Sequence, residues 1–105
     1  MPQFDIYLNP NKKSRTAYPF IIDMQNNLVD DLATRIVAPL ALYSKFKDEE
    51  IKKLTPRVSY DGQELLILIP QISSMPTKLL KEPIGSLSHL RDEIIAALDF
   101  AIIGI

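Results

Sequence analysis

The sequence predicts an α+β fold in which a small antiparallel sheet, or a partly closed barrel, is covered by a C-terminal helix. Short β-branched and alternating segments follow one another without a βαβ pattern. The dipeptide Asp61-Gly62 separates two apolar segments, which is typical of a β-hairpin. Apolar residues recur at helical spacing near the end of the chain. Because 105 residues suit one domain, we expect residues 1–105 to form a single domain.

The first predicted strand covers residues 3–8. Its side chains alternate between apolar and more polar types, which indicates one buried and one wetted face. We expect Phe4, Ile6 and Leu8 to be buried and Tyr7 to lie on the wetted face.

Two more strands follow in the first half of the chain. Residues 9–16 are rich in Asn, Lys and Pro and predict a hairpin loop, after which residues 17–23 predict the second strand. Pro19 predicts an edge position or a bulge, because proline donates no hydrogen bond to a neighbouring strand. Residues 24–33 are polar and turn-like, and residues 34–42 predict the third strand.

The middle of the chain predicts a charged connection and then a hairpin. Residues 45–54 predict a surface connection with at most a turn or two of helix. Residues 57–60 and 64–69 predict paired strands around Asp61-Gly62. The five consecutive apolar residues 65–69 indicate a central strand that is covered on both faces, with the last helix as one cover.

The final segment predicts an amphipathic helix. Ser86 or Ser88 could cap its start, Asp92 and Glu93 lie near its first turns, and Gly104 lies at its end. The apolar positions at helical spacing are Leu87, Leu90, Ile94, Leu98, Ala101, Ile102 and Ile105.

This helix is apolar on more than one side, since Asp99 is the only polar residue between Ile94 and Ile103. Each large apolar side chain left in water forgoes about 1.5–3 kcal/mol relative to burial. We therefore expect a homodimer packed partly through the helix ends. The alternative is a curved sheet that wraps the helix within one chain. The predicted dimer-interface residues are Ile95, Phe100, Ile102 and Ile103.

Composition excludes several classes of protein. The net charge of -1 provides no broad positive field for binding nucleic acid directly. The chain has no cysteine and no basic segment before a long apolar one, so we expect a cytoplasmic protein without disulfides or a secretory signal. The apolar stretch 94–105 is shorter than the roughly 20 residues that cross a bilayer, so we expect no membrane partner.

The residues offer no evident active site. His89 and Ser88 are neighbours on one turn, which rarely gives triad geometry. The pairs Asp30-Asp31 and Glu49-Glu50 lack a third ligand at metal spacing, and three glycines do not form a phosphate-binding loop. We therefore expect a binding protein with no catalytic residue, metal or cofactor.

Several segments in order resemble the CcdB family of toxins. They are Gln3, Phe4 and Tyr7; the block YPFIIDMQNNLVDDLATRIVAPL over residues 18–40; Ser74 and Pro76; Leu87-Ser88-His89; and Gly104-Ile105. The resemblance implies an SH3-like barrel with extra strands, a C-terminal helix and a symmetric homodimer. It also implies a toxin of a type II toxin–antitoxin module that binds the DNA gyrase A subunit and traps gyrase on cleaved DNA. A CcdA-type antitoxin would fold a disordered segment over the toxin and remove it.

The resemblance also carries over site residues. The family's gyrase contacts are its last three residues, commonly Trp-Gly-Ile, which here are Ile103, Gly104 and Ile105. The antitoxin site falls on the first loop and after the third strand, at Asn9, Asn11, Lys12, Lys13, Ser14, Arg15, Tyr43, Lys45 and Lys47. On composition alone, Lys12, Lys13 and Arg15 would be a solvated loop tip.

Two alternatives remain open. One is a chromosomal homologue that no longer acts on gyrase and only binds the antitoxin, which is consistent with isoleucine in place of tryptophan. A MazF-type endoribonuclease shares the barrel, although it would need a basic RNA groove and an acid/base pair.

Overall fold

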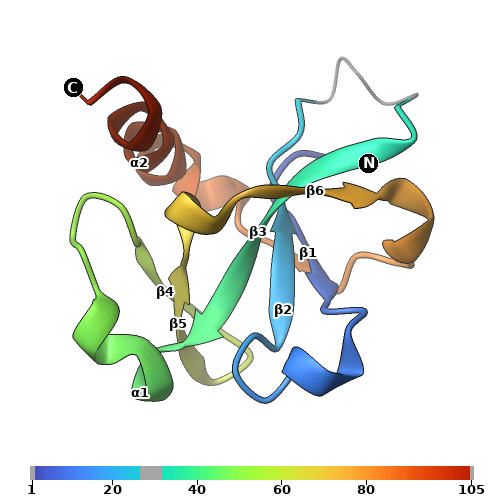
Figure 1. Cartoon of the computed structure of the whole chain (residues 1–105), viewed down its shortest axis with the longest axis horizontal. Coiled ribbons are helices and arrows are strands. Elements are labelled where there is room, and N and C mark those ends of the chain that lie inside the picture. Colours follow the sequence, from blue (N-terminus) through green and yellow to red (C-terminus); the bar gives the residue numbers. More distant parts are fainter. Residues whose placement is uncertain (1, 27–31, 105) are drawn as a thin grey trace.

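In the computed structural model, which describes residues 2–26 and 32–104, seven strands form one curled antiparallel sheet (Figure 1). The strand order is β4-β5-β3-β2-β1-β7, and β6 pairs with the first half of β3. The predicted α+β class is confirmed. The elements are β1 (Asp5–Leu8), β2 (Phe20–Asp23), β3 (Thr34–Leu42), α1 (Tyr43–Phe46), β4 (Arg57–Tyr60), β5 (Gln63–Ile67), β6 (Ser73–Pro76), β7 (Gly85–Ser86) and α2 (Arg91–Ile103).

β2 corrects the expectation for Pro19. This strand lies between β1 and β3, so it is neither an edge strand nor bulged at the proline. Pro19 comes directly before the strand and only accepts, through its carbonyl, a hydrogen bond of 3.1 Å from the Asn9 N–H. A proline at that position removes no hydrogen bond from the sheet. β3 has the predicted bounds, whereas residues 27–31 of the predicted turn lie outside the described residues.

β1 corrects the expected pattern of burial. Phe4 and Ile6 are buried as predicted, but Leu8 is 46% exposed and Tyr7 is only 2% exposed. Tyr7 packs with Ile21 and with Leu80, which belongs to the segment that follows β6. That segment covers the face that was expected to be wet, so β1 is buried on both sides for most of its length.

The β4–β5 hairpin is confirmed. Asp61 and Gly62 have φ values of 54° and 73°, the left-handed conformation that this two-residue turn requires. β5 lies between β4 and β3 and is covered on both faces, as expected. Leu65 and Ile67 belong to the core beneath α2. On the other face, Leu66 and Leu68 pack with Tyr18, Tyr43 and Phe46.

Two boundaries in this half differ from the predictions. Ile69 lies in a 3-10 turn, Ile69–Gln71, rather than in β5, because Pro70 at the start of the turn cannot donate to a neighbouring strand. The short helical piece begins earlier than residue 45: α1 starts at Tyr43 and is followed by the 3-10 turn Lys47–Glu49.

α2 packs across one face of the sheet through Ile94 and Ala97, both of which are buried. Leu90 occupies the N-cap without a side-chain hydrogen bond, so the predicted serine cap is wrong. The Ser86 hydroxyl instead accepts a 3.1 Å hydrogen bond from the Ser88 N–H in the turn before the helix. Gly104 ends the helix with φ 81°, and its N–H donates to the Phe100 carbonyl at 3.0 Å.

Tyr60 and Gly85 hold the two ends of the curled sheet together. The Tyr60 hydroxyl donates a hydrogen bond of 2.5 Å to the Ile84 carbonyl, and its ring lies edge-on to Phe20 with 5.3 Å between centroids. A Cβ atom on Gly85 would lie 2.5 Å from the ring carbon Cε1 of Tyr60. The Tyr60 ring can therefore lie against β7 in this position only because residue 85 has no side chain.

We expect Gly85→Ala to lower the free energy of unfolding by about 1–3 kcal/mol, the usual cost of forcing an extra methyl group into a packed site. Urea denaturation followed by circular dichroism would measure the loss. Gly85→Ala in a Tyr60→Ala background is the control, since removing the ring should remove most of the penalty. An equal penalty in both backgrounds would contradict the proposed contact.

Candidate protein-binding surfaces

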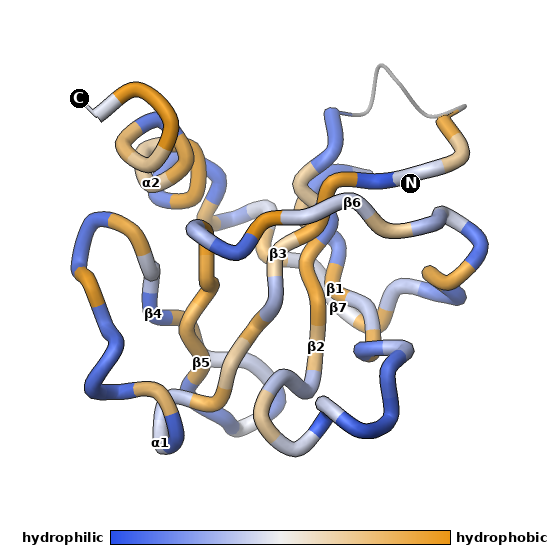
Figure 2. Tube along the Cα trace, in the orientation of Figure 1, coloured by the Kyte–Doolittle hydropathy of each residue, from blue (hydrophilic) through white to orange (hydrophobic). Residues whose placement is uncertain are grey.

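The last turn of α2 projects beyond the sheet and forms an exposed apolar tip, defined as Ile102, Ile103 and Gly104 (Figures 1 and 2). Ile102 is 68% exposed and Ile103 is 64% exposed. Ala101 is exposed as well, so the predicted stripe does not continue against the sheet to the end of the helix. The sheet does not wrap this end of the helix, contrary to the alternative considered for the sequence. Ile105 lies outside the described residues.

The other two predicted interface residues are partly covered within the chain. Ile95 is half-buried and packs against the main core. Phe100 is also half-buried, and the Lys53 ammonium nitrogen lies 5.3 Å from the centroid of its ring. The surface available to a partner is therefore concentrated at Ile102 and Ile103, with Phe100 beside it.

The first loop is held in shape by Asn9. Its side-chain amide donates to the Ser14 hydroxyl at 2.9 Å and to the Tyr18 carbonyl at 2.8 Å. Its side-chain oxygen accepts from the Asn11 N–H at 2.9 Å, and its carbonyl accepts from the Arg15 guanidinium at 2.5 Å. Since Asn9 is buried, we assign it a structural role. The residues of this loop that face solvent include Asn11, Lys12 and Lys13.

The residues that follow this loop pack beside α1, so the two segments predicted to bind the antitoxin are neighbours in the structure. The rings of Tyr18 and Phe46 lie 5.2 Å apart, and the Leu42 N–H donates to the Ala17 carbonyl at 3.0 Å. Tyr43 is half-buried under the Arg57 guanidinium, 3.8 Å from its ring centroid. Lys45 and Lys47 are exposed. Figure 1 shows this loop and α1 at the end of the molecule opposite the tip.

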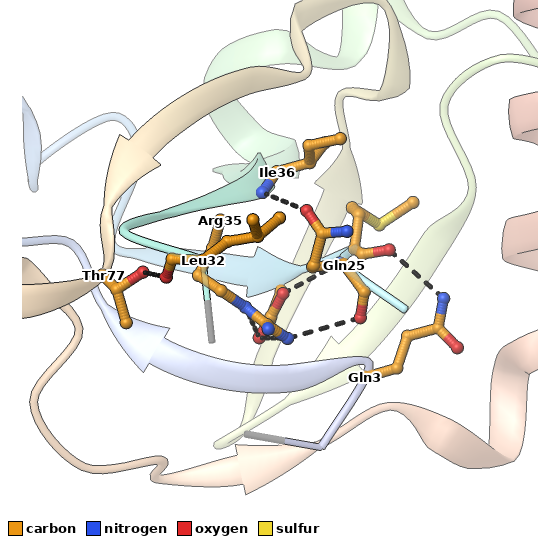
Figure 3. A network of polar contacts seen from close by, with 8 residues as sticks. Gln3, Gln25, Leu32, Arg35, Ile36 and Thr77 are labelled. Carbon is orange, nitrogen blue, oxygen red and sulfur yellow. Dashed lines mark hydrogen bonds and ion pairs between the residues drawn. The ribbon is translucent and has the colours of Figure 1, made fainter. Parts of the chain in front are cut away.

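A buried ion pair was not anticipated from the sequence. Arg35 on β3 and Asp23 on β2 have fully buried side chains, with 2.8 Å between a guanidinium nitrogen and Oδ2 (Figure 3). The other carboxylate oxygen accepts from the Gln25 N–H at 2.9 Å. Charged residues at inward positions of two apolar strands were the available signal. Nothing in the pattern of spacing indicated that these two would meet.

The same network extends to α2. Gln3 donates to the Met24 carbonyl at 3.2 Å and accepts from the Arg91 guanidinium at 3.1 Å. Ile36 donates its N–H to the Gln25 side-chain oxygen at 3.4 Å. Residues next to the ion pair thus connect the end of β2 to the segment before β1 and, through Gln3, to the first residue of α2, which supports a structural role for this region.

Asp5 lies near this network, and burial raises the pKa of its carboxyl group, with repulsion from Asp23 adding to the shift. A raised pKa means that the folded state binds the proton more readily than the unfolded state, so this group lowers stability as pH rises through its two pKa values. We expect Asp5→Asn to be more stable than the wild type at neutral pH. The difference should disappear at a pH below the pKa of the unfolded carboxyl.

Thermal unfolding at several pH values would test this prediction, with Asp48→Asn, an exposed carboxyl, as the control. A stability difference that stays constant down to acid pH would contradict it.

Only some of the residues considered for chemistry fall within the described part of the chain. His89 is exposed in the 3-10 turn Ser88–Leu90, and Asp30 and Asp31 lie outside the described residues. Within residues 2–26 and 32–104, no group of three His, Cys, Asp or Glu side chains is placed to hold a metal ion. None of the helices in this part of the chain is long and apolar enough to span a membrane.

The sequence matches a known protein family. The family model described as CcdB protein matches residues 3–104. The match includes the sheet, α2 and the whole tip, and it extends over nearly all of the 105 residues. The chain therefore belongs to the CcdB family, the toxins of toxin–antitoxin modules.

Proposed function

We propose that this toxin acts by binding the A subunit of DNA gyrase and trapping gyrase on cleaved DNA, without catalysis of its own. The observation that carries the proposal is the exposure of Ile102 and Ile103, at 68% and 64%. Two large apolar side chains held in water at the end of a rigid helix are costly to the free protein and favourable in a complex. The contact residues would be Ile103, Gly104 and Ile105.

The negative end of the α2 dipole supports this choice of surface. The last turn of α2 contains no basic side chain, and its terminal carbonyl groups point toward the tip. The tip therefore combines apolar area with a partial negative charge, which suits a target surface that presents a cation among apolar residues.

We propose that the protein works as a symmetric homodimer. Self-association would cover part of the apolar surface at Ile95, Phe100, Ile102 and Ile103, and a two-fold axis would present two copies of the tip to a two-fold target. The antitoxin would be of the CcdA type and would bind the loop around Asn11, Lys12, Lys13, Ser14 and Arg15 together with Tyr43, Lys45 and Lys47.

A gyrase cleavage assay with purified protein tests the proposal. We expect cleaved DNA to accumulate with the wild type, and Ile103→Lys to reduce cleavage by about tenfold or more, because a buried apolar contact worth about 1.5–3 kcal/mol is replaced by a charge. Ile84→Lys is the matched control, since Ile84 is 47% exposed but lies directly before β7, away from the tip. We expect this variant to retain full activity.

Other outcomes point to the alternatives. If the wild type traps no cleaved DNA but still binds its antitoxin, the protein is a homologue that has lost the action on gyrase. If it degrades RNA in the absence of gyrase, it is an endoribonuclease. Equal activity of Ile103→Lys and the wild type would assign the gyrase contact to another surface.

A further inference from the structure

β4 has an open edge. Tyr60 and Gln63 flank the two-residue turn, so their main chains pair, and the alternation of an antiparallel ladder makes Val58 the next residue of β4 that bonds to β5. At the other end, the Pro56 carbonyl accepts the Ile67 N–H at 2.9 Å, in agreement with this alternation. The main-chain N–H and C=O groups of Arg57 and Ser59 therefore point away from β5. Among the described residues, these four groups have no main-chain partner.

A groove lies between the start of this edge and α2. Its volume of about 510 Å³ falls in the range of clefts that hold ligands. Thr55, Pro56 and Arg57 line one wall, and Ala96, Ala97 and Phe100 line the other. The groove thus begins beside main-chain groups that need hydrogen-bond partners, and it has an apolar wall on α2. Edge strands that are protected against pairing do not usually combine these two features.

The charges at the groove indicate the chemistry of what enters it. Lys52 and Lys53 line it, and neither forms an ion pair with another described residue. The Lys53 ammonium lies over the Phe100 ring. A change of side-chain rotamer would let it pair with a carboxylate of a bound partner. Glu50 and Glu93 also line the groove and balance part of the positive charge. A segment with one carboxylate near the two lysines fits better than a run of acidic residues.

We infer that an extended segment of the antitoxin adds a strand to the open edge of β4 and passes into this groove. The inference rests on the proposed function, because the antitoxin is its occupant. Only an extended chain has free main-chain groups that can pair with Arg57 and Ser59, since a helix uses its own. Side chains alternate along such a strand, so every second residue should be apolar and face Ala97 and Phe100.

The position of the groove gives this strand a regulatory role. Phe100 lines the groove and lies one helical turn before Ile103 in the tip. A chain that fills the groove would stand directly beside the surface that we assign to gyrase. Antitoxin and gyrase would then compete for α2, even though the first loop and α1 lie at the opposite end of the molecule.

Amide hydrogen exchange measured by NMR tests the inference on the full ¹⁵N-labelled chain, saturated with a purified CcdA-type antitoxin. We expect the Arg57 and Ser59 amides to exchange at least about tenfold more slowly in the complex, as amides do when they enter a ladder. Val58 and Tyr60, whose amides already bond to β5, are the internal reference. This readout needs no variant and therefore does not depend on a variant folding.

A proline substitution provides the matched pair. Ser59→Pro removes the side-chain hydroxyl and one main-chain group, an N–H that points outward, at a position where an edge strand tolerates proline. Ser59→Ala removes the same hydroxyl, which donates to the Glu64 carboxylate, but keeps that N–H. We expect Ser59→Pro to weaken antitoxin binding about tenfold or more relative to Ser59→Ala, through the lost hydrogen bond and the clash of the ring with the incoming strand.

The outcomes separate this inference from the proposed function. A saturated complex without protection of Arg57 and Ser59 would overturn the inference and leave the proposed function standing. Protection that appears in the isolated chain and grows with its concentration would overturn it too, since a second copy would then cover the edge. If no complex forms with the wild type, the proposed antitoxin partner fails and the inference fails with it, whereas the proposed action on gyrase is decided separately by the cleavage assay.

Discussion

Arg35→Met is expected to lower the free energy of unfolding by about 3–5 kcal/mol, because it removes one partner of a buried ion pair and leaves the other charge without compensation. Both side chains have no solvent exposure, so water cannot take the place of the guanidinium. Methionine keeps much of the length of the side chain, which limits the part of the loss that comes from an empty cavity. A loss of this size is a large fraction of the 5–15 kcal/mol that usually stabilises a domain.

Urea denaturation followed by circular dichroism would measure this loss. The control is the double variant Asp23→Leu/Arg35→Met, which buries neither charge. Replacing both partners by apolar residues often costs little, so the double variant should be more stable than Arg35→Met alone. It should still fall short of the wild type by about 1 kcal/mol, because the Gln25 N–H loses its acceptor on Asp23. A change below about 1 kcal/mol in Arg35→Met would contradict the structural role assigned to the pair.

Ile94→Ala is expected to lower the free energy of unfolding by about 2–5 kcal/mol. Ile94 has no solvent exposure and belongs to the core between α2 and the sheet. Truncating it removes apolar contacts and leaves a cavity that the surrounding strands can fill only in part. Because α2 is held to the sheet mainly through Ile94 and Ala97, this one change tests how the helix is anchored.

Ile102→Ala is the matched control for Ile94→Ala, with the same substitution in the same helix. Ile102 is 68% exposed, so the change within one chain should stay within about 0.5 kcal/mol. Unfolding measured over a range of protein concentrations would separate this effect from dimerisation. In the proposed homodimer, the wild type gains stability with concentration and Ile102→Ala gains less. Equal and large losses in both variants would show that the tip is packed within the subunit.

The segments that could be predicted are those whose conformation is set by the preferences of residues close together in the sequence. Asp61-Gly62 fixes a turn that only residues tolerant of positive φ can form, and its flanking strands followed as expected. Residues 34–42 formed β3 with the predicted bounds because the run is long and β-branched. Gly104 ended α2 for a similar local reason. The exposed tip was anticipated in part, since no single sheet face could bury so many apolar residues.

Other features depend on which distant segments come into contact. The local sequence pattern does not show these contacts. Tyr7 is buried because Leu80 reaches it from a segment more than seventy residues later, and no alternation within β1 could reveal that cover. Pro19 removes no hydrogen bond from the sheet because it lies just before an interior strand. The meeting of Asp23 with Arg35 depends on the pairing of β2 with β3, and the two charges are stable in the core only once they face each other.

Local conformational preference and the order of residues were enough to predict the class of fold, the hairpin, the helix and the likeness to a toxin family. Three features became known only from the folded chain: which apolar side chains stay in water, where the buried charges lie, and the open edge of β4 beside a groove. These depend on contacts between distant segments, whose free energy is set by burial and pairing in three dimensions.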